Sequence, residues 1–531
     1  DQQSLGQANT TLQNAQNALQ NGQKNVQSDQ ANLQNDQQQV QKDYQQAQQD
    51  LQNNNLPAYN NDIAHYNQDI AKLNADTTQF NADSALIPQL TRQVSTAQAQ
   101  YNILNAQVSA DQSALNIAKS GNRIVYQQSF TGDTDDNYGH GTHVAGIIAG
   151  DGKKSLGNNF TKTFIGIAPN AYLINLKALD QNGLGTDSTV INAIQTAINL
   201  KSQYNIRVIN LSLGRPVYES YTIDPLCQAV EQAWKAGIVV VVAAGNAGRD
   251  NSANTNGYGT ITAPGNDPYV ITVGAMKPMD TSTRTDDLIA SYSSKGPTLY
   301  DHIVKPDLVA PGNRAISVLA GGSVPEYSQT VNFVSHSSYI VNGDKNASSN
   351  YFQLSGTSMA AAVVSGGVAD LLEAQPQLTP DQVKARLMQT AYKTFPSYSS
   401  TTDPTTGITY TSQYDIFTIG AGYLDLQAAL VSTDVATGSA LSPTVTYDSS
   451  SGTVRLVTAQ GMVWGSSDPW ATGMVWGSNT IDATGMVWGS GCVWGSSSPE
   501  GFGMVWGSGM VWGSSSSVAS EATTTVIGGE N

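Results

Sequence analysis

A histidine flanked by glycines is the first residue in this chain whose type and setting suit catalysis. It is His140, in the segment 139–143 (Gly-His-Gly-Thr-His). Imidazole changes charge near neutral pH, so it can take a proton from a nucleophile and return it to a leaving group. A second histidine, His143, follows, but no third histidine or carboxylate stands at a fixed spacing, as a zinc site would need. The segment therefore indicates a general base rather than a metal site.

A serine among small residues is the matching candidate nucleophile. Ser358 lies in the segment 355–361 (Ser-Gly-Thr-Ser-Met-Ala-Ala), directly before an Ala/Val stretch of helical type. Small neighbours leave a hydroxyl open to a substrate. The start of a helix supplies backbone amides and the positive end of a dipole, both of which stabilise an oxyanion.

A third polar residue ends an apolar run. In the segment 241–248 (Val-Val-Ala-Ala-Gly-Asn-Ala-Gly), Asn246 follows a predicted buried strand. An amide side chain at the carboxyl end of a strand can donate a hydrogen bond into the crevice where α/β folds bind ligands. Taken alone, each motif also has a structural interpretation: a packed histidine, a helix cap and a turn asparagine.

The pattern of apolar and polar residues in 119–433 predicts the helices and strands that would position these residues. Short apolar runs alternate there with helical patterns and glycine turns, which predicts a doubly wound, mainly parallel α/β sheet. One helix is expected to begin at Asp224-Pro225 and to end at Gly237. Another follows Ser188 and Thr189. The predicted strands are 171–176, 207–211, 238–243 and 269–273.

In this order, the three motifs resemble those of the subtilisin-like serine peptidases (subtilases, peptidase family S8), and the likeness covers most of residues 119–433. That family orders its catalytic residues Asp, His, Ser. The resemblance implies His140 as general base, Ser358 as nucleophile and Asn246 as oxyanion donor. It also implies that His143 packs behind the site. No cofactor is required for such chemistry.

The resemblance extends to the segments that would bind a polypeptide substrate. One looks like the family's strand that pairs with an extended substrate, and the other looks like a wall of its first specificity pocket; they comprise Ser212, Leu213, Gly214, Ala243, Ala244 and Gly245. Backbone pairing of this kind accepts many sequences. The implied activity is that of a secreted serine endopeptidase.

Two departures from the family pattern stand out. Ala362 occupies a position where the family usually has proline, a change that removes no catalytic group. More importantly, no apolar strand ending in Asp-Ser-Gly or Asp-Thr-Gly precedes His140. The nearest acids are Asp133, Asp135 and Asp136, which we expect to form a solvated acidic turn, with calcium binding as an alternative.

The missing aspartate is expected upstream of this chain. The chain begins with Asp1 and its first methionine is Met276, so we expect that a signal peptide and a pro-region are also not in it. Residues 1–118 would then be an insertion between the family's Asp and His motifs. If the upstream piece is cleaved, it is expected to remain a bound partner. Without the aspartate, the chain alone would be poorly active.

Residues 1–118 have the composition of long helices, rich in Gln and Asn. Apolar residues recur at seven-residue steps, which is typical of coiled coils. The break at residues 53–57 predicts an antiparallel helical hairpin, and a loosely ordered polar segment is the alternative. The first arm carries Leu5, Leu12, Leu19, Val26, Leu33, Val40 and Ala47, and the second carries Tyr66, Leu73, Phe80, Ile87, Val94, Tyr101 and Val108.

Residues 434–531 change to a Ser/Gly-rich linker and then to a repeat. The unit Met-Val-Trp-Gly-Ser begins at Met462, Met474, Met486, Met504 and Met510. Short units with large apolar residues and Gly-Ser turns predict a small repetitive β structure. Because exposed tryptophans stack on sugars, contact with a glycan or another surface is an alternative role for this tail.

Composition excludes several classes of function. The formal net charge of -16 has the wrong sign for tracking nucleic acid, so no nucleic acid partner is expected. The two cysteines form no CxxC or Cys/His cluster, and no metal site is predicted. No apolar run reaches the roughly 18 residues of a membrane span. The rival to a peptidase is a catalytically impaired scaffold used for surface binding or attachment, and the joint presence of His140, Ser358 and Asn246 argues against it.

Overall fold

The computed structural model describes residues 2–120, 123–281, 283–323, 332–403, 406–448 and 453–457, with the segments 481–482, 487–488, 492–493, 518–520 and residue 530. Its contacts divide the chain into two units, Asp1–Asn116 with Ser202–Asn205 and Ile117–Lys201 with Ile206–Asn531. Most of the Trp-containing repeats lie outside the described residues. The repetitive tail and the domain boundaries therefore stay predictions.

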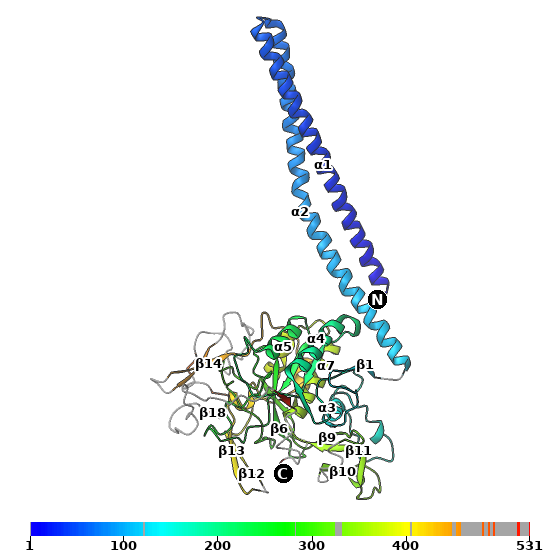
Figure 1. Ribbon diagram of the computed structural model, residues 1–531, viewed down its shortest axis with the longest axis vertical. Coiled ribbons are helices and arrows are strands. Elements are labelled where there is room, and N and C mark those ends of the chain that lie inside the picture. Colours follow the sequence, from blue (N-terminus) through cyan, green and yellow to red (C-terminus); the bar gives the residue numbers. More distant parts are fainter. Residues whose placement is uncertain are drawn as a thin grey trace. The chain divides into compact units, whose positions relative to one another are not determined.

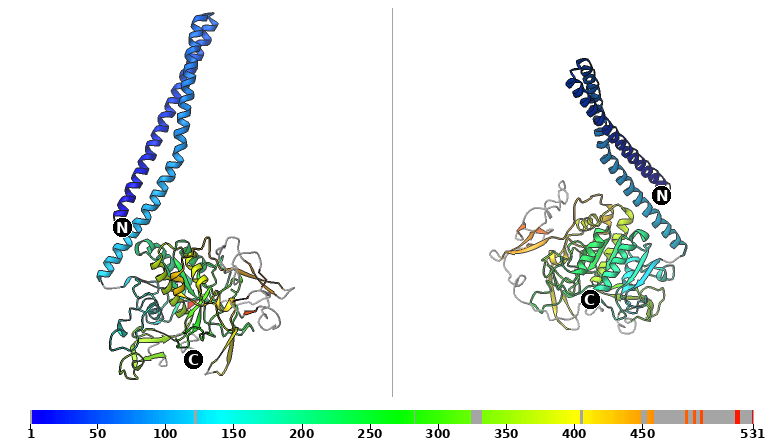
Figure 2. Two further views of the ribbon diagram at one scale, coloured as in Figure 1. Left: turned by 180° about the vertical axis from the view of Figure 1, so that it is seen from behind. Right: turned by 45° about the horizontal axis from the view of Figure 1, so that its top comes forward.

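The first unit contains two long antiparallel helices, α1 (Gln2–Gln52) and most of α2 (Leu56–Ser120), which lie side by side in all the views of Figures 1 and 2. Three pairs of residues lie at the interface of the two helices. Residues later in α1 contact residues earlier in α2, which shows that the helices are antiparallel. The rings of Tyr44 and Tyr66 are 5.8 Å apart, and Lys72 pairs with Asp36 at 2.5 Å. A β-carbon at Gly22 would lie 3.0 Å from Leu90 Cδ1. The hairpin agrees with the prediction, and the missing side chain at Gly22 lets Leu90 of α2 approach α1.

The second unit is built on a five-stranded sheet of β4 (Val208–Leu211), β5 (Val239–Ala243), β6 (Ile271–Lys277), β7 (Leu288–Ile289) and β8 (Leu308–Pro311). Strands β4, β5, β6 and β8 are parallel, and β7 is antiparallel to β6. A separate two-stranded parallel sheet contains β1 (Ile124–Ser129) and β2 (Leu173–Lys177). The four predicted strands correspond to β2, β4, β5 and β6, and β6 runs farther than predicted because its second half pairs with β7 and β8.

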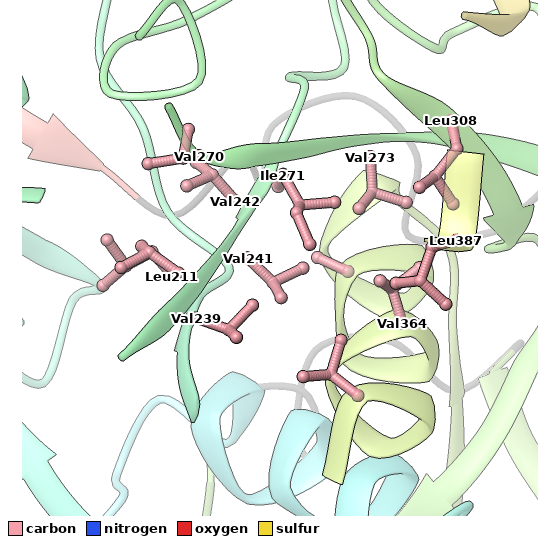
Figure 3. Close-up of a cluster of buried hydrophobic side chains, with 14 of the residues drawn as sticks. Leu211, Val239, Val241, Val242, Val270, Ile271, Val273, Leu308, Val364 and Leu387 are labelled. Carbon is pink, nitrogen blue, oxygen red and sulfur yellow. The ribbon is translucent and has the colours of Figure 1, made fainter. Parts of the chain in front are cut away.

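The core forms where this sheet meets its helices. Side chains of β5 and β6 face Val364 of α7 (Thr357–Ala374) and Leu387 of α8 (Pro380–Thr390) (Figure 3). Every residue of β5 is buried, as expected for the centre of a sheet covered on both faces. Strands β14 (Thr444–Asp448) and β15 (Thr453–Val457), which lie in the segment predicted as a linker, pair in antiparallel fashion, and their Val445, Val454 and Leu456 join the same core.

The helix that follows β4 shows how sequence signals set its ends. Helix α5 (Pro225–Lys235) begins with proline, and the Asp224 carboxylate accepts a 2.9 Å hydrogen bond from the Leu226 amide. After its last turn Gly237 adopts a positive φ of 83°. Both boundaries agree with the prediction from the sequence, because an N-cap acid, an N-terminal proline and a terminal glycine act locally.

The remaining elements complete the second unit and its extensions. The other helices are α3 (His140–Ala149), α4 (Asp187–Tyr204), α9 (Ile416–Ile419), α10 (Leu426–Val431) and the 3-10 turns η1 (Lys153–Ser155) and η3 (His336–Ser338). The other strands are β3 (Leu184–Thr186), β9 (Ala315–Val318), β10 (Phe333–Ser335), β11 (Ala347–Leu354), β12 (Tyr398–Thr402), β13 (Thr409–Gln413), β14 (Thr444–Asp448), β15 (Thr453–Val457), β16 (Ile481–Asp482), β17 (Val487–Trp488), β18 (Cys492–Val493) and β19 (Val518–Ser520). In the described part of the chain, no helix is both long and apolar enough to cross a bilayer.

Candidate active site

Two helices carry the histidine and serine candidates at their starts. His140 is the first residue of α3, and Ser358 is the second residue of α7. Val144 and Ile147 of α3 pack in one apolar cluster with Met359 and Ala362 of α7. Val144 and Ile147 lie four and seven residues after His140, and Met359 and Ala362 lie one and four residues after Ser358, so the two helices pack side by side near these residues.

A close contact farther along confirms the register of this pair. A β-carbon at Gly366 would lie 3.3 Å from the Ile148 carbonyl oxygen. Ile148 and Gly366 are equally far along their helices from His140 and Ser358. The fold therefore brings His140 and Ser358 together at one end of a parallel helix pair. Both are buried, with exposed fractions of 6% and 1%.

The turn that carries Ser358 is fastened to the end of β4. The Ser358 hydroxyl donates a hydrogen bond of 3.4 Å to the Ser212 carbonyl, and the Ser212 hydroxyl donates one of 2.8 Å to the Ser358 carbonyl. Ser212 Oγ accepts a hydrogen bond from Asn210 Nδ2, and Asn210 Oδ1 accepts one from Ser365 of α7. Ser212, predicted from the sequence to contact substrate, therefore lies directly against the candidate nucleophile.

Asn246 is oriented by Thr357, a residue that the sequence argument did not single out. The Asn246 Oδ1 atom accepts hydrogen bonds from the Thr357 amide at 2.9 Å and from its hydroxyl at 3.0 Å. The same hydroxyl oxygen accepts the Gly245 amide at 3.1 Å. These bonds fix the oxygen of the Asn246 amide and therefore also the direction of its NH₂ group. The position of Thr357 between Gly356 and Ser358 was the available signal, because a hydroxyl at a helix start can bind neighbouring backbone.

Two donors border the space beside Gly356. A β-carbon at this glycine would lie 3.2 Å from Asn246 Nδ2 and 3.7 Å from the Ser358 amide nitrogen. Gly356 has a φ of 155°, a backbone angle that residues other than glycine rarely adopt. An amide side chain and a helix-start amide thus converge on one small volume, which is the arrangement that stabilises an oxyanion.

The other predicted substrate-binding residues lie along two adjoining loops. Leu213 and Gly214 continue from β4, and Arg215 pairs with Ala263 through backbone hydrogen bonds of 3.0 and 2.8 Å. The Arg215 guanidinium is held by Asp187 at 3.0 Å and Asp224 at 2.7 Å. Ala243 ends β5, and Ala244 and Gly245 follow it toward Asn246.

The acidic turn before His140 differs in part from the expectation. The prediction of a solvated side chain was wrong for Asp136. Its carboxylate accepts hydrogen bonds from the amides of Gly139 at 2.8 Å and Thr142 at 2.6 Å, and it therefore caps the start of α3. Exposed amides at a helix start attract a nearby carboxylate, a bias that the segment's polarity alone did not reveal. The Lys177 ammonium binds the Asp133 carboxylate and the Asp135 carbonyl. Among the described residues no cluster of three metal-ligating side chains exists, and calcium binding stays a prediction.

His143 packs behind the helix start, as the resemblance implied. It is 1% exposed, and its Nε2 lies 3.1 Å from the Phe352 carbonyl oxygen. Burial, reinforced by the nearby His140, lowers the pKa of His143 from 6.5 to about 3. The imidazole is therefore neutral at neutral pH, and it donates to the Phe352 carbonyl.

The lowered pKa of His143 predicts a loss of stability in acid. Below about pH 6.5 the unfolded chain binds a proton at this residue that the folded chain does not bind until about pH 3. The unfolding free energy should therefore fall as pH drops through this window, by up to about 1.4 kcal/mol per pH unit from this group. Urea titrations of wild type and His143→Gln, which keeps an N–H donor, measure the difference. Identical slopes for the two proteins between pH 6.5 and 4 would contradict the assignment.

Comparison with known proteins identifies similar sequences. The profile of the subtilase family matches residues 77–422. Serine protease AprX of Bacillus subtilis (strain 168) is 41% identical over 262 residues, covering 48% of this chain and 52% of AprX. Subtilisin DY of Bacillus licheniformis is 35% identical over 295 residues, covering 56% of this chain and 84% of that protein.

Among solved structures, fervidolysin from Fervidobacterium pennivorans, a keratinolytic enzyme related to subtilisin, matches with 26% identity and a TM-score of 0.40, covering 57% of this chain and 38% of fervidolysin. The chain spans about half the length of several curated relatives, with 52% of AprX and 53% of subtilisin E covered. The family match extends over most of the chain and includes the His140 and Ser358 motifs. The chain therefore belongs to the subtilase family.

Proposed function

We propose that this protein is a secreted serine endopeptidase that hydrolyses peptide bonds by acyl transfer. The observation that carries the proposal is the alignment of His140 and Ser358 at the starts of two parallel, packed helices. Ser358 Oγ attacks the peptide carbonyl carbon while His140 accepts its proton. His140 returns the proton to the departing amine, and water then cleaves the acyl ester by the same route. These steps require no cofactor.

The oxyanion of each tetrahedral intermediate would be held by Asn246 Nδ2 and the Ser358 amide. Support comes from the position of both donors around Gly356 and from the clamp that Thr357 places on the other end of the Asn246 amide. Donors fixed before reaction need no reorganisation when charge develops, which makes this contribution large. The substrate would be an extended polypeptide along residues 212–214 and 243–245.

The catalytic aspartate is proposed to arrive on a strand from upstream sequence. Strand β2 ends one parallel sheet and β4 ends the other, and no described strand pairs with the outer edge of either. Leu176 of β2 and Val208 and Ile209 of β4 pack against the same core but are only partly buried, unlike every residue of β5. Unpaired strand edges beside half-buried apolar side chains favour an additional strand between them.

Such a strand would end beside the candidate site. Strand β4 leads directly into Ser212, which binds the Ser358 turn. A parallel strand between β2 and β4 has its carboxyl end at this same edge of the sheet, where α3 begins with His140. An aspartate there could accept a hydrogen bond from the imidazole, hold its productive tautomer and stabilise its charged form.

The nucleophile is tested by covalent labelling of the protein that contains the upstream sequence. A fluorophosphonate should label wild type, and Ser358→Ala should abolish the labelling. Ser188→Ala removes a hydroxyl from an exposed position on α4, outside the contacts of the candidate site, and it should still be labelled. Equal labelling of Ser358→Ala and wild type would refute the assignment of the nucleophile.

Thr357 is expected to act through Asn246 as a positioning residue. Asn246→Ala should lower kcat by roughly 10²–10³-fold with little change in KM. Thr357→Val keeps the side-chain shape but removes the hydroxyl, so it should lower kcat by about tenfold or more, and Thr357→Ser should restore it. In the Asn246→Ala background, Thr357→Val should have little further effect on kcat, because the group that it orients is gone. Independent, multiplicative effects on kcat would show that Thr357 does not work through Asn246.

The upstream strand is tested by a single exchange within it. The upstream gene sequence should encode an apolar strand that ends in Asp-Thr-Gly or Asp-Ser-Gly. Replacing this aspartate with asparagine should leave a folded protein and lower kcat by roughly 10⁴-fold. If the strand is cleaved from the mature protein, it should co-purify with this chain. A gene that encodes no such strand, together with an inactive full-length product, would favour the attachment-scaffold function instead.

A further inference from the structure

A buried glutamate near the end of the sequence occupies a polar pocket of the second unit. Glu530 is only 4% exposed. Its carboxylate lies 2.7 Å from Arg249 Nη2 and accepts the Ser291 amide at 3.0 Å. The Ser291 hydroxyl also donates to this carboxylate. One side chain is thus bound by a cation, a backbone amide and a hydroxyl.

The backbone of Glu530 is bound as well. Asn313 Nδ2 donates to the Glu530 carbonyl oxygen at 2.9 Å, and the Glu530 amide donates to Asn313 Oδ1 at 2.9 Å. A single side chain therefore satisfies both peptide groups of one residue, in the way that an adjacent strand would. Such pairing recognises a peptide backbone, and the carboxylate contacts add selection for an acidic side chain.

The pocket does not depend on Glu530 for its shape. Arg249 Nε donates to Ser291 Oγ at 2.7 Å, and Arg249 Nη1 pairs with Asp403 at 2.9 Å. The guanidinium also lies over the ring of Tyr410, 4.8 Å from its centroid. Because Asp403 balances the charge of Arg249, removing Glu530 leaves no unpaired buried cation. The pocket should persist when its present occupant is absent.

The pocket around Glu530 lies next to the loop that precedes Ser358. Arg249 follows β5 on the same segment as Asn246, and Asn313 follows β8. The residues on either side of Asn313 bind that loop: the Gly312 carbonyl accepts the Gly356 amide at 2.8 Å, and the Arg314 amide donates to Ser355 Oγ at 2.8 Å. The pocket lies at the carboxyl edge of the parallel strands, where ligands of α/β folds bind.

We propose that Arg249, Ser291 and Asn313 form a binding site for a glutamate within an extended peptide segment, and that Glu530 is the ligand supplied by this chain. Glu530 then fastens its part of the chain onto the second unit through these three residues. The site contains no group assigned to bond cleavage, so the inference does not rest on the proposed peptidase function.

The site is tested with a fluorescent peptide of residues 525–531 (Thr-Val-Ile-Gly-Gly-Glu-Asn). The full chain with Glu530→Ala has an empty pocket and should bind the peptide at least tenfold more tightly than wild type, in which Glu530 competes. A peptide with glutamine in place of the glutamate should bind the same variant about tenfold to 100-fold more weakly, because hydrogen bonds to a charged group are lost. Fluorescence anisotropy reports both affinities.

Matched variants separate recognition from a general effect on folding. Adding Arg249→Gln to Glu530→Ala should abolish binding of the peptide. Glu373→Ala removes the same charge from an exposed position and should behave as wild type. Should Glu530→Ala fail to fold, Glu530→Gln preserves the backbone contacts and should be displaced by the glutamate peptide. Circular dichroism checks that each variant is folded.

Two results would overturn the proposal. One is the absence of peptide binding to any folded Glu530 variant, and the other is equal binding of the glutamate and glutamine peptides. The measurements are repeated in the Ser358→Ala background, where the expected affinities are the same. A failure of peptide binding can therefore be distinguished from a failure of the peptidase assignment.

Discussion

The packing of α3 against α7 is the constraint on which the candidate site depends. Small residues make it possible. A β-carbon at Gly366 would lie 2.6 Å from Ile167 Cβ, and one at Gly146 would lie 2.3 Å from Ser317 Oγ. The same β-carbon at Gly366 would lie 3.3 Å from the Ile148 carbonyl oxygen of α3, so glycine there lets α7 lie close to α3, while Gly146 lets β9 lie close to α3. Together these glycines allow tight packing around the parallel alignment of the two helices. That alignment brings His140 and Ser358 to one end, at the edge of the sheet where β4 leads into Ser212.

Hydrogen bonds then fix the orientation of the side chains and backbone groups at this site. Ser212 holds the Ser358 turn from the strand side, while Thr357 holds Asn246 from the helix side. Each contact joins residues far apart in the sequence; the contact of Ser212 is buried and that of Asn246 is partly buried, and an unmade hydrogen bond in such a place is costly. The result is a group of donors arranged before any substrate binds, as electrostatic stabilisation of a transition state requires.

A buried charged cluster lies at the other edge of the sheet, where β6 and β8 begin. Lys305 and Lys384 bind the two oxygens of Asp307 at 2.7 and 3.1 Å, and the Lys384 ammonium also donates to the carbonyls of Pro268 and Val270. The two ammonium groups hold the pKa of Asp307 below its usual value despite its burial. The parallel sheet is thus fastened at the starts of β6 and β8 and open between β2 and β4. The upstream strand proposed above would pair with these open edges, near His140.

Local signals in the sequence were sufficient for much of this protein. The helix boundaries at Asp224 and Gly237, the positions of four strands and the helical hairpin follow from caps, apolar runs and heptads, all of which act over a few residues. The motifs around His140, Asn246 and Ser358 identified the family for the same reason, since their residue types and order are visible without the fold.

Tertiary structure decided the rest. Three sets of contacts could not be inferred from the sequence. Thr357 orients Asn246, and Asp136 caps α3. Glu530 fills a pocket made by Arg249, Ser291 and Asn313. The strands that determine these contacts are far apart in the chain, and periodicity contains no information on which distant polar groups meet. The split between β2 and β4 belongs with these findings, because an unpaired edge exists only relative to the strands beside it. The sequence by itself determined which chemical groups are present, and the packing of sheet and helices decided which of them face one another.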